Sequence, residues 1–236
     1  MTDLSTGKPI GTALIVSGDA VATQQLGEAL RELALSVEVC TKLSEAMDRV
    51  NHRKLEVGVV DFSLGNQATL FFEQVRASAS NRTAVTFAIT NSSTETAYAL
   101  KAGSSFVLER PLSLDSIRNT LNTAYGMIAR ERRRYFRYPI SVPAAASRKG
   151  ESEVFGRTVN ISERGMAIST STPLMPGTEV TMQFTLTNTH LAITAECKVC
   201  WHNDKGLSGL SFLFLPSNLS SELQAWLARR LEEASA

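Results

Sequence analysis

The sequence predicts a protein of class α/β plus all-β: a doubly wound parallel five-stranded domain, followed by an antiparallel β-barrel with a C-terminal helix. Three observations lead to this prediction. The 236 residues are enough for two domains of ordinary size. In the first half, short apolar runs alternate strictly with amphipathic stretches. After Met127, short alternating runs separated by Gly, Pro and Asn replace that pattern.

The first half contains five short apolar runs rich in β-branched residues, which predict strands. They are Thr12–Ser17, Ser36–Cys40, Leu55–Asp61, Thr83–Thr90 and Ser105–Leu108. Each is followed by an amphipathic stretch that predicts a helix: Ala20–Leu35, Lys42–Asn51, Ala68–Ser78, Ser93–Ala102 and a last one from about Leu114. Near-continuous apolar strands in this alternation favour a parallel sheet covered on both faces. Proteins with such sheets bind their ligands beyond the carboxyl ends of the strands.

A dense group of arginines marks the change of pattern, because Arg130–Arg137 holds five arginines and one glutamate. The short strands predicted after it include Phe155–Val159, Gly165–Ser169, Glu179–Leu186, Leu191–Trp201 and Leu207–Leu215. Ser217–Glu233 carries apolar residues at helical spacing and predicts an amphipathic helix. We therefore expect an α/β domain over residues 1–127, an arginine-rich linker over 128–138 and a β-barrel with its helix over 139–236.

Composition restricts the class of protein further. Hydrophobic residues make up 43% and charged residues 20% of the chain, which is typical of globular proteins. The apolar runs fall short of the roughly 18 residues that span a bilayer, and the first residues lack the features of a secretion signal. Three unevenly spaced cysteines make no disulfide framework. These features predict a cytoplasmic protein without membrane insertion.

Polar residues follow the predicted parallel strands. Asp61 follows the third strand and Thr90 the fourth, and Lys101–Pro111 closes the fifth unit. With the five alternating units, these residues resemble the receiver domain of response regulators over about half of the chain. The resemblance implies that Asp61 is the phosphoacceptor and Thr90 the switch hydroxyl, with Mg²⁺ as the metal of the reaction.

The sequence departs from the receiver pattern where the metal would bind. The family's acidic pair would fall on Ser17 and Gly18, and Arg110 stands at the position of the family's lysine. Mg²⁺ prefers carboxylate oxygens as ligands. Phosphoryl transfer depends on the metal ion to neutralise the charge of the phosphoryl group. Asp19 lies just beyond and is expected to cap the first helix. Two interpretations stay open: a phosphorylated regulator using Asp61, and a degenerate receiver kept for docking or self-association, with Arg110 paired to Asp61.

Two motifs of the second half occur together and in order. Arg133 and Arg137 form an RxxxR sequence, and Asn160–Gly165 has the form [DN]xSxxG between two predicted strands. Ahead of a β region, the pair resembles the PilZ domain, the receptor module for cyclic di-GMP, from about Arg130 to the C-terminus. The resemblance implies that Arg133 and Arg137 bind phosphate and guanine. It also implies that Asn160, Ser162 and Gly165 face the other base, and that Arg132 contacts a second, stacked ligand molecule.

The chemistry of these residues suits that ligand independently. Cyclic di-GMP carries two phosphodiester charges and two guanines. Arginine binds phosphate oxygens through two parallel hydrogen bonds, pairs with guanine O6 and N7, and stacks on purine faces. Asn160 offers an amide and Ser162 a hydroxyl. Gly165 allows close approach of a backbone or a positive φ.

Other interpretations of these features stay open or are disfavoured by the sequence. The arginines could be a solvated helix end or a nucleic-acid patch. A nearly balanced charge, 24 Lys+Arg against 23 Asp+Glu, disfavours a long nucleic acid. Cys197 and Cys200 form a CxxC, but residues three apart on a strand point to opposite faces, so no metal site is expected. Trp201 and Trp226 are expected in the core or in helix packing. No catalytic residue and no catalytic cofactor is predicted.

These expectations combine into one functional prediction, a non-enzymatic signalling adaptor with cyclic di-GMP as its regulatory ligand. The ligand is expected to order the arginine-rich linker on the barrel and to reposition the receiver-like domain. That domain is expected to bind a protein partner or itself. A phosphorylation-dependent regulator and a ligand-independent interaction module remain as alternatives.

Overall fold

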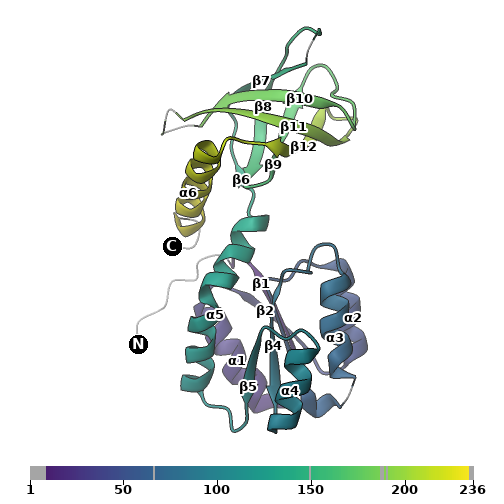
Figure 1. Cartoon of the computed structure of the whole chain (residues 1–236), viewed down its shortest axis with the longest axis vertical. Coiled ribbons are helices and arrows are strands. Elements are labelled where there is room, and N and C mark those ends of the chain that lie inside the picture. Colours follow the sequence, from purple (N-terminus) through teal and green to yellow (C-terminus); the bar gives the residue numbers. More distant parts are fainter. Residues whose placement is uncertain (1–8, 66, 149, 187–188, 190, 234–236) are drawn as a thin grey trace. The chain divides into compact units, whose positions relative to one another are not determined.

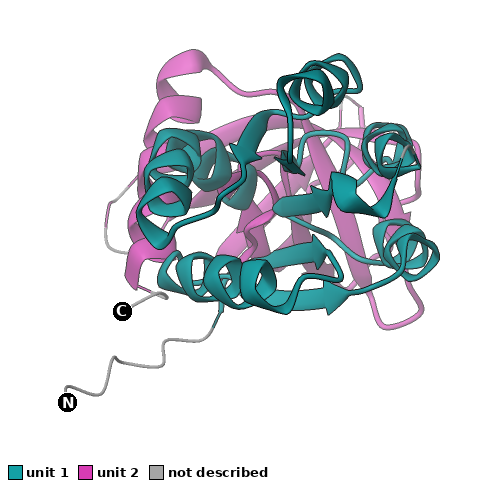
Figure 2. Ribbon diagram, turned by 90° about the horizontal axis from the view of Figure 1, so that it is seen from below, with its two compact units in different colours: residues 1–132, 234–236 teal, residues 133–233 magenta. Residues whose placement is uncertain are grey.

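The computed structural model describes residues 9–65, 67–148, 150–186, 189 and 191–233 (Figure 1). The chain divides into two compact units between Arg132 and Arg133 (Figure 2). Each unit has its own hydrophobic core. The predicted domain limits at residues 127 and 139 stay a prediction.

Unit 1 is a parallel sheet with helices between its strands. The strands are β1 (Thr12–Val16), β2 (Ser36–Cys40), β3 (Val57–Asp61), β4 (Val85–Thr90) and β5 (Phe106–Glu109). The helices are α1 (Ala20–Glu32), α2 (Leu43–His52), the 3₁₀ turn η1 (Phe62–Leu64), α3 (Ala68–Ala77), α4 (Ser93–Lys101) and α5 (Leu114–Tyr135). The order β2-β1-β3-β4-β5, parallel throughout, is the doubly wound order of flavodoxin-like folds. The predicted fold class of the first half is confirmed.

The two faces of this sheet are covered by different helices (Figure 1). Ala13 and Ile15 of β1 pack with α1 and α5, whereas Leu14 and Val16 pack with α2, α3 and α4. Successive strand residues point to opposite faces, so a strand buried on both sides must be apolar throughout. The carboxyl ends of β1 and β3 are neighbours in this order, which brings the residues after them together.

Unit 2 is a closed antiparallel barrel with a helix. Its strands are β6 (Tyr138–Pro139), β7 (Pro143–Ser147), β8 (Val154–Ser162), β9 (Gly165–Thr170), β10 (Glu179–Thr185), β11 (Ala192–His202) and β12 (Leu207–Phe214), and its helix is α6 (Ser217–Glu233). The order β8-β7-β10-β11-β12-β9 is closed by pairing of β8 with β9, and β6 adds to β8. Leu223, Trp226 and Leu227 of α6 belong to the barrel core. The predicted barrel with a C-terminal helix is confirmed.

Helix α5 differs from the flexible arginine segment that the sequence suggested, because it continues through the arginines to Tyr135. Arginine and glutamate favour helix. Glu131 is buried in unit 1, where its carboxylate accepts hydrogen bonds from Lys54 Nζ at 2.6 Å and Thr83 Oγ1 at 3.0 Å. Arg132 is also buried and donates to the carbonyl of Leu33. These contacts hold the end of α5 in helical form.

Among the described helices, none is both long and apolar enough to cross a membrane.

Candidate ligand-binding site

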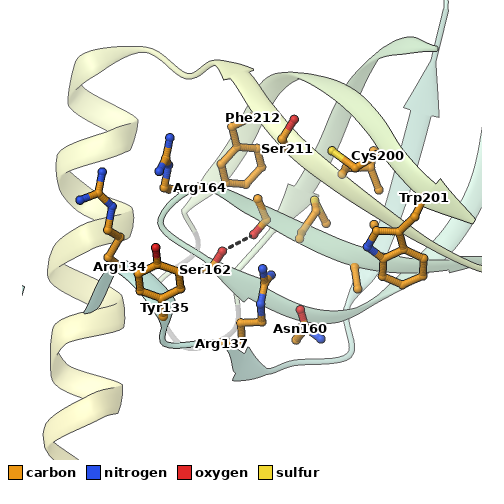
Figure 3. A pocket seen from close by; sticks show the side chains of 15 residues that line it. Arg134, Tyr135, Arg137, Asn160, Ser162, Arg164, Cys200, Trp201, Ser211 and Phe212 are labelled. Atoms are coloured by element: carbon orange, nitrogen blue, oxygen red, sulfur yellow. Dashed lines mark hydrogen bonds between the residues drawn. The ribbon is translucent and has the colours of Figure 1, made fainter. Parts of the chain in front are cut away.

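Unit 2 has a groove of about 710 Å³ beside the turn that joins β8 to β9. Its lining comes from the end of α5, from β8, β9 and their turn, and from β11 and β12. The side chains labelled in Figure 3 are Arg134, Tyr135, Arg137, Asn160, Ser162, Arg164, Cys200, Trp201, Ser211 and Phe212. Of the predicted site residues, Arg137, Asn160, Ser162 and Gly165 therefore meet in one groove.

The charge in the groove is positive. Arg134, Arg137 and Arg164 line it, and the described lining residues include no carboxylate. Arg134 and Arg164 lie toward one end, and Arg137 lies beside Asn160 (Figure 3). Arg137 is exposed and makes no hydrogen bond or ion pair with the described part of the chain. Three guanidinium groups around one groove, with no carboxylate among its described lining residues, favour an anionic ligand, and phosphate oxygens in particular.

The β8–β9 turn presents polar groups to the groove. The Asn160 Oδ1 atom is buried and has no hydrogen-bond partner among the described residues. Ser162 Oγ donates to the Gly165 carbonyl at 2.9 Å, and this hydrogen bond closes the turn. The oxygen of the hydroxyl can still accept a hydrogen bond from a ligand. A buried carbonyl oxygen without a donor costs free energy. Asn160 is therefore suited to a ligand that supplies an N–H.

Gly165 allows two strands to approach each other closely, and its φ is not in the positive region. A Cβ at this position would lie 2.1 Å from the Leu210 carbonyl oxygen, across the pairing of β9 with β12. A side chain would push the two strands apart beside the groove. Of the two roles that the sequence left open for Gly165, the structure selects the first.

Trp201 corrects the expectation that it lies in the core. Its side chain is 46% exposed and lines the groove at the end away from Arg134 (Figure 3). Strict alternation along β11 would bury it, but the register with β12 shifts between Val199 and Trp201. A bulge of this kind turns a side chain to the other face. The indole lies across Gly209, where a Cβ would come within 2.1 Å of Trp201 Nε1.

Two predicted site residues lie elsewhere. Arg132 belongs to unit 1, where its guanidinium is buried and its Nε has no partner in the described part of the chain. Burial lowers the pKa of Arg132. Arg133 is outside the groove lining, and its Nε lies 3.9 Å from Glu163 Oε1. Arg134 and Arg164, which the sequence analysis did not select, line the groove in their place.

A second polar site lies in unit 1 at Asp61. This carboxylate is fully buried and accepts hydrogen bonds from Ser17 Oγ at 2.7 Å and from the Ser63 amide at 2.9 Å. Arg110 donates to both of its oxygens, at 3.0 and 2.8 Å. Arg110 also donates to Asp19 at 2.9 Å, and Asp19 caps α1 by accepting from Val21 and Ala22. The expected pairing of Arg110 with Asp61 is present in the structure.

These contacts fix the charge of the site. Burial raises the pKa of the Asp61 carboxyl, but hydrogen bonds from Arg110, Ser17 and Ser63 outweigh burial and leave its pKa below 3.8. The hydrogen bond to Asp61 is the main cause that raises the pKa of Arg110. Thr90 Oγ1 pairs with Thr96 Oγ1 at 3.0 Å. Asp61 is therefore an ionised carboxylate neutralised by a permanent cation.

The residues around Asp61 do not fit the Mg²⁺ that receiver domains use. Ser17 and Gly18 supply no carboxylate, and both oxygens of Asp61 are already engaged by Arg110, Ser17 and Ser63. A guanidinium between the two remaining carboxylates repels a second cation. Among the described residues, no group of three or more His, Cys, Asp or Glu side chains could hold a metal ion.

The CxxC pair lies on opposite faces of β11. Cys197 is buried in the barrel core, and Cys200 is exposed. Burial raises the pKa of the Cys197 thiol to about 12. This thiol stays protonated at neutral pH, which is unfavourable for both metal ligation and nucleophilic chemistry.

Residues 131–229 match the sequence model of the PilZ domain family. This part of the chain is a PilZ domain, and the first half has the doubly wound β2-β1-β3-β4-β5 sheet of flavodoxin-like folds. The PilZ family is a family of cyclic di-GMP receptors. No protein with a curated description matches the chain.

Several solved structures are similar to the chain. A response regulator from Thermotoga maritima is 16% identical with a TM-score of 0.43, over 50% of this chain and 98% of that one. The receiver domain of a Pseudomonas aeruginosa PAO1 sensor histidine kinase, with magnesium coordinated in its active site cleft, is 18% identical with a TM-score of 0.44, over 49% and 98%. The Bacillus subtilis inhibitor of motility is 18% identical with a TM-score of 0.37, over 43% and 52%.

Proposed function

We propose that this protein is a cyclic di-GMP-binding signalling adaptor, and that the ligand occupies the groove beside the β8–β9 turn. The observation that carries the proposal is the pairing of two features in one groove: three arginines without a carboxylate, and the buried Asn160 Oδ1 without a donor. The first suits phosphodiester oxygens and the second suits the N–H groups of a guanine edge. The membership of this segment in the PilZ family supports the same ligand.

The groove residues have distinct roles in this proposal. Arg137 binds phosphate and the guanine O6 and N7 atoms, and Arg134 and Arg164 neutralise the second phosphodiester. Trp201 offers an exposed indole on which a purine can stack, a contact worth about 1–3 kcal/mol in single-strand binding proteins. Arg133 joins the site once it leaves Glu163, and Arg132 reaches a second stacked ligand once it leaves its buried position in unit 1.

Binding in this groove has a route to the receiver-like unit through the covalent chain. Helix α5 is continuous across the boundary at Arg132 and Arg133, and only Phe136 and Arg137 separate its end from β6. A ligand that draws Arg133, Arg134 and Arg137 together favours those directions of α5 that allow the contacts. The proposed effect is a population shift between two arrangements of the receiver-like unit. The free energy of this shift equals the difference between the ligand's binding free energies for the two arrangements.

The receiver-like unit is proposed to act as a docking or self-association module without phosphorylation. The support is the neutralised Asp61 and the lack of a fit for Mg²⁺ around it. The adaptor would then work without catalysis and without a catalytic cofactor. We place it in the cytoplasm, where a nucleotide messenger would reach it.

Calorimetric titration of the full chain tests the proposed ligand. Cyclic di-GMP is expected to bind with a dissociation constant of about 10 µM or tighter. Cyclic di-AMP, which has the same two phosphodiesters but lacks guanine, is expected to bind at least about tenfold more weakly, because adenine has no O6 acceptor for the arginines. Equal affinity for the two dinucleotides would reject guanine recognition, and no binding of either would reject the proposed function.

The substitution Glu163→Gln is expected to tighten cyclic di-GMP binding about threefold. Glu163 holds Arg133 Nε at 3.9 Å and places a carboxylate next to the groove's turn, so it competes with a dianionic ligand for the same cation. Titration calorimetry measures the change. A double-mutant cycle gives the control: in an Arg133→Ala background, Glu163→Gln should lose most of its effect. Weaker binding by Glu163→Gln would show that the carboxylate supports the site instead.

A further inference from the structure

A cluster of two aromatic rings and one guanidinium joins α6 to β6. The rings of Tyr138 and Trp226 meet edge to face at 5.2 Å between centroids, with an interplanar angle of 88°. The Arg230 guanidinium lies 5.7 Å from the Tyr138 ring centre and 5.4 Å from that of Trp226. Trp226 is 2% exposed and belongs to the barrel core. Glu233 accepts a hydrogen bond from Arg230 at 2.6 Å and holds it over the rings.

The cluster contacts the chain one residue away from the groove. Tyr138 directly follows Arg137, and its backbone pairs with Ile161 of β8, while Pro139 pairs with Asn160. Tyr138 is therefore held on its backbone side by β8 and on its side-chain side by α6. Phe136 packs against the same ring at 6.3 Å. The residues on both sides of Arg137 are thus fixed by the cluster.

The side chain of Arg137 has no such support. It is exposed, and in the described part of the chain its guanidinium makes no hydrogen bond or ion pair. Its position relative to Asn160 and Ser162 is set by its backbone alone. A side chain that must be immobilised on binding loses affinity, and a backbone already in place reduces that loss.

We infer that Tyr138, Trp226 and Arg230 form a positioning cluster by which α6 holds Arg137 at the groove, so that α6 is part of the ligand-binding apparatus of this PilZ domain. The inference rests on the proposed function in one respect, the expected change in affinity for cyclic di-GMP. The immobilisation of the Arg137 backbone is a property of the ligand-free protein. Arg230 acts through the two rings and does not line the groove.

Three variants on α6 test the inference by calorimetry with cyclic di-GMP. Arg230→Met keeps an unbranched apolar stem but removes the cation, and it is expected to weaken binding about fivefold. Arg230→Lys restores a cation over the rings and is expected to recover most of the affinity. Arg229→Ala removes the exposed neighbouring arginine on the same helix and is expected to leave the affinity unchanged. Wild-type affinity in Arg230→Met, or no rescue by lysine, would overturn the inference.

Two further readouts separate positioning from other roles. The slope of log affinity against log salt is expected to stay the same in Arg230→Met, because no charged contact to the ligand is lost. A smaller slope would mean that Arg230 contacts the ligand directly, which overturns the positioning role. Without ligand, ¹⁵N relaxation of the Arg137 amide is expected to show faster internal motion in Arg230→Met than in the wild type. Unchanged motion there would overturn the inference even if cyclic di-GMP did not bind.

Discussion

Replacing Arg137 with alanine is expected to weaken cyclic di-GMP binding about a hundredfold. The guanidinium lies exposed in the groove without a partner in the described part of the chain, so its removal leaves no buried group unpaired and should not affect folding. Two charge-assisted hydrogen bonds of about 1.5 kcal/mol each amount to about 3 kcal/mol, or roughly two orders of magnitude in the dissociation constant. Calorimetry measures the affinity, and circular dichroism checks the fold.

Two matched variants refine this prediction. Arg137→Lys keeps the charge but loses the planar fork, so about a tenfold loss is expected. Arg148→Ala removes another exposed arginine of the same unit, one that pairs with Glu151 and lies outside the groove, and it should bind like the wild type. An Arg137→Ala variant with wild-type affinity would show that the ligand does not use this groove.

The second large effect is expected in unit 1, where Arg110→Met should destabilise the folded unit by about 3–5 kcal/mol at pH 7. Asp61 is fully buried, and without Arg110 its charge would be left with hydrogen bonds from Ser17 and Ser63 only. Removing one partner of a buried pair leaves an uncompensated charge, which costs more than the pair itself contributes. Urea unfolding of the full chain, followed by circular dichroism, gives the free energy of the transition.

The pH dependence follows from the pKa of Asp61. In the wild type this pKa lies below the ordinary value of 3.8, so the stabilisation is complete above that value and is lost as pH falls through the folded pKa. In Arg110→Met the hydrogen bonds from Arg110, which are the main cause that lowers the pKa of Asp61, are lost, and burial raises that pKa. The variant's deficit should therefore shrink on acidification, because protonation removes the uncompensated charge.

Two controls accompany this substitution. Arg110→Met combined with Asp61→Asn removes both charges and is expected to recover most of the lost stability. Arg118→Ala removes an exposed pair with Glu32 in the same unit and is expected to change the stability little. An Arg110→Met variant as stable as the wild type at neutral pH would contradict the structural role of this pair. An acyl-phosphate adduct at Asp61 after treatment with acetyl phosphate and Mg²⁺ would contradict the proposal that the receiver-like unit acts without phosphorylation.

Much of the fold was predictable because the hydrophobic pattern and the turn residues agree. The helix predicted over Ser217–Glu233 has those bounds in the structure. The sequence did not indicate β6 and β7, since proline lies within or at the start of each and the alanines of β7 have low strand propensity. The length of α5 was missed because its last turns are held by burial of Glu131 and Arg132 in unit 1, which no local pattern reveals.

The candidate site was predictable where a motif fixes local geometry. Asn160, Ser162 and Gly165 lie together because one turn carries all three. The choice among the arginines was not predictable, because neighbours on a helix point about 100° apart and the direction of each depends on where α5 ends. Trp201 was missed because alternation along β11 places it inward, and only the shift in register with β12 turns it into the groove.

The most direct test of the central claim is a ¹⁵N–¹H NMR titration of the full chain with cyclic di-GMP. The account predicts saturable shifts of the backbone amides of Ser162 and Gly165 and of the Trp201 indole N–H, with one common dissociation constant. The first two groups belong to the β8–β9 turn and the third to β11, and all three meet at the groove. Saturable shifts confined to residues away from this groove, or none at a ligand concentration of about 100 µM, would contradict it.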